Sequence, residues 1–525
     1  SMTIYAGIYL VYSVLDFKRH FTYEIDEFMH WGKMVRIMDH LDRFYCVPES
    51  NLLAHKDYPP LISVIELLFG KASGGVSEGS VSFGIHLLSG LLICASFCLF
   101  AGEKESRGGK IRILSGLLKG TAMGVSSMVL MRMFDSYDIF NTIYTDLYIA
   151  AAAIYLFAFI LCLGEEEGKT ETGAVILISS AILLSKQIGI FFAGLSFVLY
   201  FLVTKKKIRT VFCVLIPAFS FLTWKIYIKI LGLSGQFELG RISIKTLFKE
   251  LMSFESTRSI VTREFLKSLF DVQLSWGIVP LTFFGAFIVC IAALIFLYRY
   301  GKDGFGTYRI NITSVMVLAG AIGYIGTLYV LYMFCFEEYE MRILASFNRY
   351  MSTYWLFAIG LIAIMLLSLR KEITLSAWFI LLAVLVCVCG PMNLSCLKPQ
   401  VLRGELMKEY REFAEQVIGM AEPGDRIFVI TPNRFLDNMY LQYYLDDIDL
   451  IDGEYDYMAE ISAGDPGWEA IENDIVQSSY VLVMDPTDAM KEEFADKTDG
   501  DLKDGCIYKV ETDGRSFMLH PVANY

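Results

Sequence analysis

Long apolar stretches without a single charge constrain this sequence more than any other feature. Residues 278–297, 311–336 and 351–369 each run for about 18 residues or more without Asp, Glu, Lys or Arg. A helix of about 20 apolar residues crosses the ~30 Å hydrocarbon core of a membrane. A helix on a soluble protein would show a polar face, which these stretches lack. We therefore expect an all-α polytopic membrane protein.

The apolar pattern predicts about eleven helical spans. They fall at residues 2–17, 80–101, 113–133, 145–163, 172–186, 188–203, 211–231, 278–298, 311–336, 350–369 and 373–390. The fifth and sixth meet at Lys186-Gln187, which predicts a hairpin with a tight turn. Segment 59–70 is apolar but too short to span, and its length favours an interfacial helix.

Charge in the connecting loops predicts the orientation. Lys and Arg are concentrated in loops 102–112, 204–210, 299–310 and 370–372, whereas loop 134–144 contains neither. Loop 164–171 departs from this pattern with Glu165 to Glu167 against one Lys, but acidic residues count little in the positive-inside rule. The rule predicts a multi-pass plasma-membrane protein with a cytoplasmic N-terminus and with 18–79, 232–277 and 391–525 outside.

The tail differs in composition from the rest of the chain and predicts a second domain. We expect a transmembrane domain at 1–390, including outer loop 18–79, and an extracytoplasmic α/β domain at 391–525. Within the tail, 426–431 and 480–484 have strand character and 468–478 has helical character. The net charge of −12, with much of the acid beyond residue 400, argues against nucleic-acid binding. Whether Cys396 and Cys506 form a disulfide is open.

The first outer loop concentrates ionisable residues. Residues 25–33 are Ile-Asp-Glu-Phe-Met-His-Trp-Gly-Lys, and in a helix Asp26, His30 and Lys33 would share one face. The loop closes with His55-Lys56-Asp57-Tyr58-Pro59-Pro60. A loop that only connects two spans does not need carboxylates, imidazoles and a stiff turn. On composition alone, a solvated helix with incidental charge is an equal alternative.

More ionisable residues fall at the predicted outer ends of the spans. They are Asp135, Asp138 and Asp146 around the second outer loop, Lys186 at the hairpin turn, and Glu337, Glu338, Glu340, Arg342 and Arg349 after the ninth span. Charges at membrane depth are costly and mark functional sites by default. The alternative is that Lys186 and Arg349 reach lipid headgroups. Convergence of all these residues on one face favours a site.

Three motifs together resemble the GT-C glycosyltransferases, multi-span enzymes that use lipid-phosphate sugars and include protein O-mannosyltransferases and aminoarabinose transferases. Asp26-Glu27-x-x-His30-Trp31, with Tyr58-Pro59-Pro60-Leu61, resembles their first periplasmic loop. Ser185-Lys186-Gln187-Ile188-Gly189 is similar to the Lys-containing turn of bacterial members, and Ala345-Ser346-x-x-Arg349-Tyr350 to a pattern in a cell-envelope subset. The resemblance covers residues 1–370, and the tail is similar to the small outer domain of some members.

The resemblance implies an inverting glycosyltransferase. It would move a sugar from a polyprenyl-phosphate carrier to an outer-face acceptor in a cell-envelope glycan, teichoic acid, lipid or protein. Asp26 would be the catalytic base, with Glu27 as the other candidate because the expected Asp is doubled here. Lys186 and Arg349 would stabilise the leaving phosphate. The expected substrate-binding set is completed by His30, Trp31, Lys33, His55, Tyr58 and Tyr350.

Cofactor use and two other functions stay open at this stage. No cofactor is required, but magnesium, manganese or calcium held by Asp138 and Asp146 with Asp26 is an alternative that some relatives suggest. A lipid or glycan transporter without glycosyl transfer would favour two related halves with charges at the bilayer midplane. A sensor or scaffold would use the tail as its working part. The sugar, the acceptor and the oligomeric state are not predicted.

Overall fold

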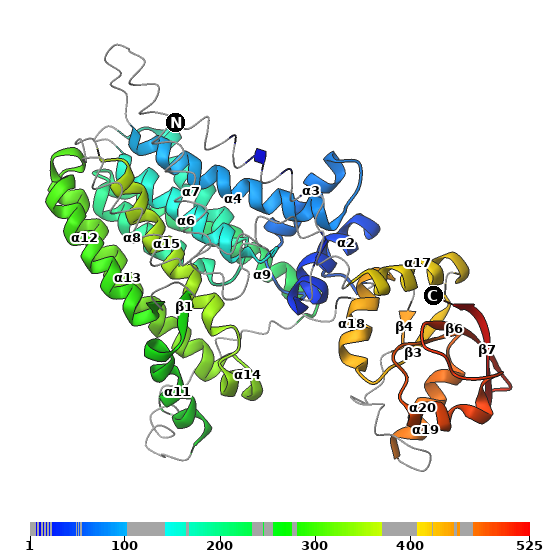
Figure 1. Ribbon diagram of the computed structural model, residues 1–525. Coiled ribbons are helices and arrows are strands. Elements are labelled where there is room, and N and C mark those ends of the chain that lie inside the picture. Colours follow the sequence, from blue (N-terminus) through cyan, green and yellow to red (C-terminus); the bar gives the residue numbers. More distant parts are fainter. Residues whose placement is uncertain are drawn as a thin grey trace. The chain divides into compact units, whose positions relative to one another are not determined.

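The computed structural model describes residues 24–48, 55–101, 142–163, 167–233, 256–275, 281–369, 407–422, 424–445, 449–451 and 466–524, with a few single positions elsewhere. The chain forms two compact units, which Figure 1 colours along the sequence. Unit 1 comprises Ser1–Arg19, Phe44–Ser50 and His55–Pro399. Unit 2 comprises His20–Arg43, Asn51–Ala54 and Gln400–Tyr525.

Unit 1 is built from helices. In chain order they are α3 (Leu61–Ala72), α4 (Glu78–Ala101), α6 (Thr145–Cys162), α7 (Lys169–Leu183), α8 (Gly189–Val203), α9 (Lys207–Ile230), α11 (Thr257–Asp271), α12 (Phe283–Phe305), α13 (Thr307–Phe334), α14 (Glu338–Ile343) and α15 (Phe347–Leu367). Strands β1 (Gln273–Ser275) and β2 (Leu281–Thr282) pair antiparallel.

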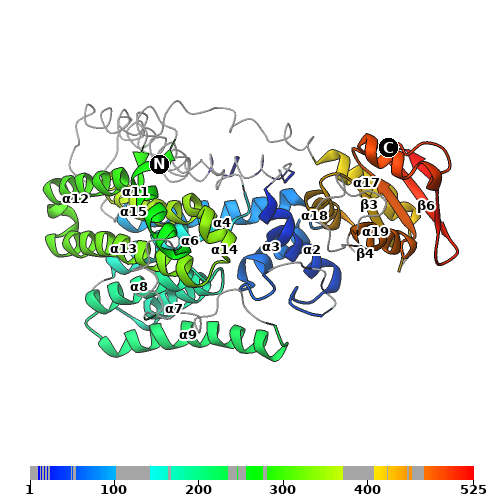
Figure 2. The same cartoon turned by 90° about the horizontal axis from the view of Figure 1, so that it is seen from below.

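Helix α6 lies at the centre of unit 1. It packs against α4, α7, α8 and α15, while α7, α8 and α9 lie side by side, as Figure 2 shows. Most of α6 and α15 is buried, whereas less than a third of the apolar stretch of α9 and of α12 is buried, and several of their large apolar side chains are exposed. Apolar residues exposed in this way suit a lipid environment, because lipid is as apolar as a protein core.

Six helices of the described residues are long and apolar enough to cross a membrane, namely α4, α6, α9, α12, α13 and α15. They confirm the helices predicted at the corresponding positions. Helices α7 and α8 have 15 residues each and meet at the predicted hairpin turn. The predicted spans 113–133 and 373–390, and most of 2–17, lie outside the described residues. The count of about eleven spans is therefore not confirmed.

Two predicted loops of unit 1 contain helices. Helix α12 continues to Phe305 and α13 begins at Thr307, so Gly306 alone separates them in the region predicted as loop 299–310. Gly306 has a φ of 81°, a left-handed value that glycine adopts without steric cost. Helix α11 lies within predicted loop 232–277, and α3 confirms the short helix predicted at 59–70.

Unit 2 is an α/β domain. Its elements are η1 (Glu27–Trp31), α2 (Gly32–Leu41), α17 (Lys408–Met420), β3 (Arg426–Ile430), α18 (Arg434–Tyr444), β4 (Asp449–Leu450), α19 (Pro466–Val476), β5 (Tyr480–Val483), α20 (Asp488–Glu493), η7 (Ala495–Lys497), β6 (Cys506–Thr512) and β7 (Phe517–Asn524). The sheet order is β4-β3-β5-β6-β7. The first three strands are parallel, and β5, β6 and β7 pair antiparallel.

Apolar side chains from the strands and helices of unit 2 form its hydrophobic core. Phe428, Val481, Tyr508 and Leu519 come from four neighbouring strands and pack with Ile471 of α19. The strands predicted at 426–431 and 480–484 and the helix predicted at 468–478 are confirmed. Cys506 is buried in β6, and Cys396 lies outside the described residues.

Part of the predicted first outer loop packs in unit 2. The ring of Phe28 meets the edges of Tyr440 and Tyr443 of α18, with centroids 4.9 and 5.0 Å apart. Phe21 also contacts Tyr443, at 5.9 Å. The predicted division kept all of loop 18–79 in the membrane domain, and the packing differs because these aromatic contacts join His20–Arg43 to the tail.

Candidate active site

Asp146, Lys186 and Arg349 form a buried charged cluster in unit 1. Asp146 lies in the first turn of α6, Lys186 in the turn between α7 and α8, and Arg349 in the first turn of α15. Lys186 Nζ donates to Asp146 Oδ2 at 2.8 Å, and Arg349 Nε lies 4.0 Å from the same oxygen. The structure thus brings together three residues that the sequence placed at the same ends of distant spans.

Aromatic rings and a hydroxyl complete the cluster. The Arg349 guanidinium lies over the Tyr144 ring at 4.4 Å, and Tyr350 is 5.2 Å from it and 5.3 Å from Lys186 Nζ. Such rings stabilise a cation through their quadrupole. Thr353 Oγ1 lies 3.1 Å from Asp146 Oδ1. Tyr144 and Thr353 were not among the site residues predicted from the sequence. The sequence does contain a signal for Thr353, because it follows Arg349 by one helical turn and therefore lies on the same face of the helix.

Two cations of this cluster converge on one carboxylate oxygen. Asp146 is 1%, Lys186 6% and Arg349 7% exposed, so all three charges are shielded from water. Buried cations are costly, and they are found where opposite charge compensates them. Lys and Arg side chains also bind phosphate oxygens with charge-assisted hydrogen bonds. A pair of cations held this close together therefore suits an anionic ligand of the phosphate class.

Close packing and strained turns place the two cations. At Gly189 a Cβ would lie 2.2 Å from Ile182 O, so only glycine permits the tight turn that carries Lys186. Before Arg349, Leu344 and Ser346 have left-handed φ values of 50° and 57°, which are uncommon for side-chain-bearing residues. Such strain persists where the surrounding structure enforces it, and it is found at functional sites.

The motif at residues 26–33, in the predicted first outer loop, begins with a π-helical turn in unit 2. Gly32 N–H bonds to Glu27 O, five residues back, and a Cβ on Gly32 would lie 2.7 Å from that oxygen. The extra residue means that the 3.6-residue spacing used to align Asp26, His30 and Lys33 does not hold across this turn. Glu27, His30 and Trp31 are buried, whereas Asp26 is half-buried.

Other predicted site residues have structural partners. The Lys33 ammonium donates to the carbonyl oxygen of Gln442 in α18, within unit 2. In unit 1 the His55 ring stacks on Tyr58 at 4.4 Å, and Tyr58 O accepts a 2.6 Å hydrogen bond from Tyr45. Residues 26–33 thus belong to unit 2, and the charged cluster belongs to unit 1.

The residues proposed for a metal do not form a ligand set among the described positions. Asp146 is already paired with Lys186, which does not suit a ligand for a hard divalent cation. Asp138 lies outside the described residues, and within those residues no group of three His, Cys, Asp or Glu could hold a metal. A divalent cation at this position stays a prediction.

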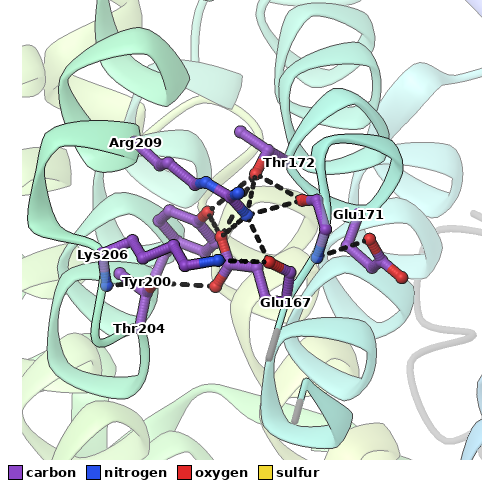
Figure 3. A network of polar contacts seen from close by, with 8 residues as sticks. Glu167, Glu171, Thr172, Tyr200, Thr204, Lys206 and Arg209 are labelled. Atoms are coloured by element: carbon purple, nitrogen blue, oxygen red, sulfur yellow. Dashed lines mark hydrogen bonds and ion pairs between the residues drawn. The ribbon is translucent and has the colours of Figure 1, made fainter. Parts of the chain in front are cut away.

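A second buried polar network lies at the other end of α6 (Figure 3). Tyr200 donates to Glu167 Oε1, Thr204 Oγ1 donates to Glu167 Oε2 at 2.7 Å, and Arg209 Nη1 lies 2.6 Å from Glu167 O. Burial alone raises the pKa of Glu167, but the hydrogen bonds that its carboxylate accepts, chiefly from Tyr200 and Thr204, outweigh burial and lower the pKa below its ordinary 4.5. The carboxylate is compensated by Arg209, so this network suits an anchor between loops.

This network also groups loops that the sequence placed on one side. Arg309 Nη2 bonds to Leu163 O at 3.2 Å, and Tyr308 OH bonds to Leu202 O at 3.0 Å. Predicted cytoplasmic segments 164–171, 204–210 and 299–310 therefore meet at one end of unit 1. The charged cluster lies at the other end, because Asp146 is in the first turn of α6 and Glu167 comes five residues after Cys162, the last residue of α6. Which end faces the cytoplasm stays a prediction from charge.

Comparison with known proteins gives structural likeness but no sequence match. No family model matches the chain, and no curated protein matches it. The structure of ArnT from Cupriavidus metallidurans bound to undecaprenyl phosphate is similar, with 11% identity, a TM-score of 0.45, and coverage of 98% of this chain and 97% of that one. The Archaeoglobus fulgidus oligosaccharyltransferase, in complex with Zn and sulfate, has 10% identity, a TM-score of 0.44, and coverage of 91% and 68%.

A further structure of that archaeal protein, AglB, in complex with an inhibitory peptide and a dolichol-phosphate, has 12% identity, a TM-score of 0.41, and coverage of 100% and 74%. Likeness at this level assigns neither a family nor an activity to this chain, so its function is argued from its own residues.

Proposed function

We propose that this chain is a membrane glycosyltransferase that moves a sugar from a polyprenyl-phosphate carrier to an acceptor hydroxyl on the outer face of the membrane. The acceptor would belong to a cell-envelope glycan, a teichoic acid, a lipid or a protein. The single observation that carries the proposal is the convergence of Lys186 and Arg349 on Asp146, buried at one end of apolar helices. A lipid phosphate combines the charge and the apolar tail that such a place would bind.

The proposed reaction assigns one role to each group. The acceptor oxygen attacks C1 of the sugar while Asp26 takes the acceptor proton. The bond between C1 and the phosphate oxygen breaks, and polyprenyl phosphate leaves with both electrons of that bond. Lys186 and Arg349 would stabilise the negative charge that develops on the phosphate. Glu27 and His30, next to Asp26 in sequence, would position the acceptor or the base.

Asp146 has a supporting role in this proposal. Its carboxylate holds Lys186 at 2.8 Å, and a partner of this kind fixes a long side chain that would otherwise sample many rotamers. The cation pair would therefore be preorganised before the lipid phosphate arrives. Preorganised charge is more effective in catalysis than charge that must reorient during the reaction.

Release of free polyprenyl phosphate by the purified protein tests the proposal. Polyprenyl-phosphate sugars of several kinds would be supplied with candidate acceptors, and the lipid product would be measured by mass spectrometry. We expect release that depends on Lys186 and on Asp26. Movement of the intact lipid-linked sugar between membrane leaflets, with no polyprenyl phosphate formed, would favour the transporter instead.

A further inference from the structure

Asp57 lies outside the charged cluster but is hydrogen-bonded to the turn that contains Lys186. Its side chain is 2% exposed, and Oδ2 accepts hydrogen bonds from Lys225 Nζ of α9 and from Gln187 Nε2, both at 2.9 Å. Asp57 O also accepts a 3.0 Å bond from the Trp224 indole. A single residue thus joins the loop before α3, helix α9 and the turn between α7 and α8.

The turn is held on both sides of Lys186. Gln187, the next residue, bonds to Asp57, and Leu184 O accepts a 3.0 Å bond from Leu61 N. Both contacts come from segment 57–61, which contains the stiff Pro59-Pro60 pair. Proline fixes φ and restricts the residue before it, so this segment is a rigid support.

We propose that Asp57 is a positioning residue that sets the affinity for the lipid phosphate through the placement of Lys186. Asp57 does not touch the phosphate in this scheme. Its carboxylate fixes Gln187, which fixes the turn, and the turn directs the Lys186 ammonium toward Asp146 and the ligand. The inference rests on the proposed function, because it takes Lys186 as a phosphate-binding cation.

Binding of a polyprenyl monophosphate to the purified full-length protein tests this role. We expect Asp57→Ala to weaken binding by about tenfold. Lys225 is partly exposed, so its ammonium can reach water or headgroups once the carboxylate is gone, and the fold should survive. Asp57→Asn keeps an oxygen acceptor for Gln187 and should recover part of the affinity. Affinity equal to that of the original protein in Asp57→Ala would overturn the inference.

A double-mutant comparison separates positioning from a general structural effect. If Asp57 acts through Lys186, Asp57→Ala should cause little further loss of affinity in a Lys186→Met background. The same loss in both backgrounds would overturn the inference. If Lys186→Met itself binds the lipid phosphate normally, the proposed function fails at Lys186, and the two failures are thereby distinguished.

Two further variants keep the test decisive. Gln187→Leu removes only the contact between Asp57 and the turn and leaves the Lys225 ion pair in place, so it should weaken binding as Asp57→Ala does. Gln187→Leu is the deciding variant if Asp57→Ala does not fold or if Lys186→Met binds the lipid phosphate too weakly to measure. Unchanged affinity of Gln187→Leu for the lipid phosphate would count against the inference. Glu167→Gln is the matched control, because Glu167 is another buried carboxylate that joins loops. It lies at the other end of α6, roughly 25 Å from the charged cluster. Its loss should leave the affinity for the lipid phosphate unchanged.

Discussion

Lys186 Nζ lies 2.8 Å from Asp146 Oδ2, and this contact joins the turn between α7 and α8 to the first turn of α6. Removing one partner of a buried ion pair leaves the other charge uncompensated, which costs about 3–5 kcal/mol. We expect Asp146→Asn to lower the thermal stability of the purified protein accordingly. Because Asp146 no longer holds Lys186 in place, added polyprenyl phosphate should stabilise this variant less than the original protein. Equal stabilisation of both would contradict a phosphate site at this cluster.

Loss of the Lys186 charge should lower the rate of transfer as well as stability, although Arg349 Nε remains 4.0 Å from Asp146 Oδ2. We expect Lys186→Met to lower the rate of sugar transfer by about 10²–10³-fold, the range for removal of one group that stabilises developing negative charge. Lys186→Arg keeps the charge and should retain part of the activity. The measurement is release of polyprenyl phosphate, with thermal unfolding as the control for folding. A Lys186→Met variant with the original rate would refute the assigned role.

The identity of the base can be tested at two neighbouring carboxylates. We expect Asp26→Asn to reduce transfer by about 10²–10⁴-fold, because a general base contributes that much. Glu27→Gln should have a smaller effect on the rate if Glu27 only positions the acceptor or the base. The same product assay measures both, with lipid-phosphate binding as the control. Full activity of Asp26→Asn together with an inactive Glu27→Gln would assign the base to Glu27.

The turn at Gly189 provides a test that changes no charge. A Cβ at position 189 would lie 2.2 Å from Ile182 O, so Gly189→Ala must displace the turn that carries Lys186. We expect weaker lipid-phosphate binding and a lower transfer rate. Gly194→Ala on the same helix is the control, because nothing lies within 4 Å of a Cβ there. It should match or exceed the original stability, since Ala suits a helix better than Gly by about 0.5–1 kcal/mol. Equal behaviour of the two variants would exclude a special role for this turn.

The anchor around Glu167 should depend on pH. Its pKa is lower in the folded protein than its ordinary 4.5, so its ionised form stabilises the fold above that pH, and the contribution is lost as the pH falls through the lowered pKa. We expect Glu167→Gln to be less stable than the original protein at neutral pH. Thermal unfolding as a function of pH should show the difference shrinking below the ordinary carboxyl pKa. A difference that is constant from neutral to strongly acidic pH would exclude this origin.

Much of unit 1 is predictable because membrane spans are long and uninterrupted. The helices at 145–162 and 347–367 followed from apolar length alone, and charge at their ends indicated Asp146, Lys186 and Arg349. Tyr144 and Thr353 were not predictable in the same way. An aromatic ring or hydroxyl next to a span is common, and only contacts between distant elements show that these two face the cluster.

Other features depended on contacts that no local pattern contains. Asp57 belongs to the His55–Pro60 motif, which the sequence shows. Its hydrogen bonds to Gln187 and Lys225 could not be predicted, because these residues are 130 and 168 positions away in the chain. The π-helical turn at 27–31 shifted the expected face of the loop helix. In the tail, two strands with β-branched residues were predicted, whereas β4 is only two residues long and gives no periodic signal.

Unit 2 combines segments from distant parts of the chain, so the ribosome makes them at different times. The segment with Asp26 and Glu27 is made before α18, because the Gln442 carbonyl that accepts the hydrogen bond from Lys33 lies 409 residues further along the chain. At the usual pace of translation, this interval is about 20–80 s. Until then Phe28 has no Tyr440 or Tyr443 to pack against. A chain that stops short of α18 therefore leaves both carboxylates on an unsupported loop, and this part of unit 2 acquires its structure only after α18 has been made.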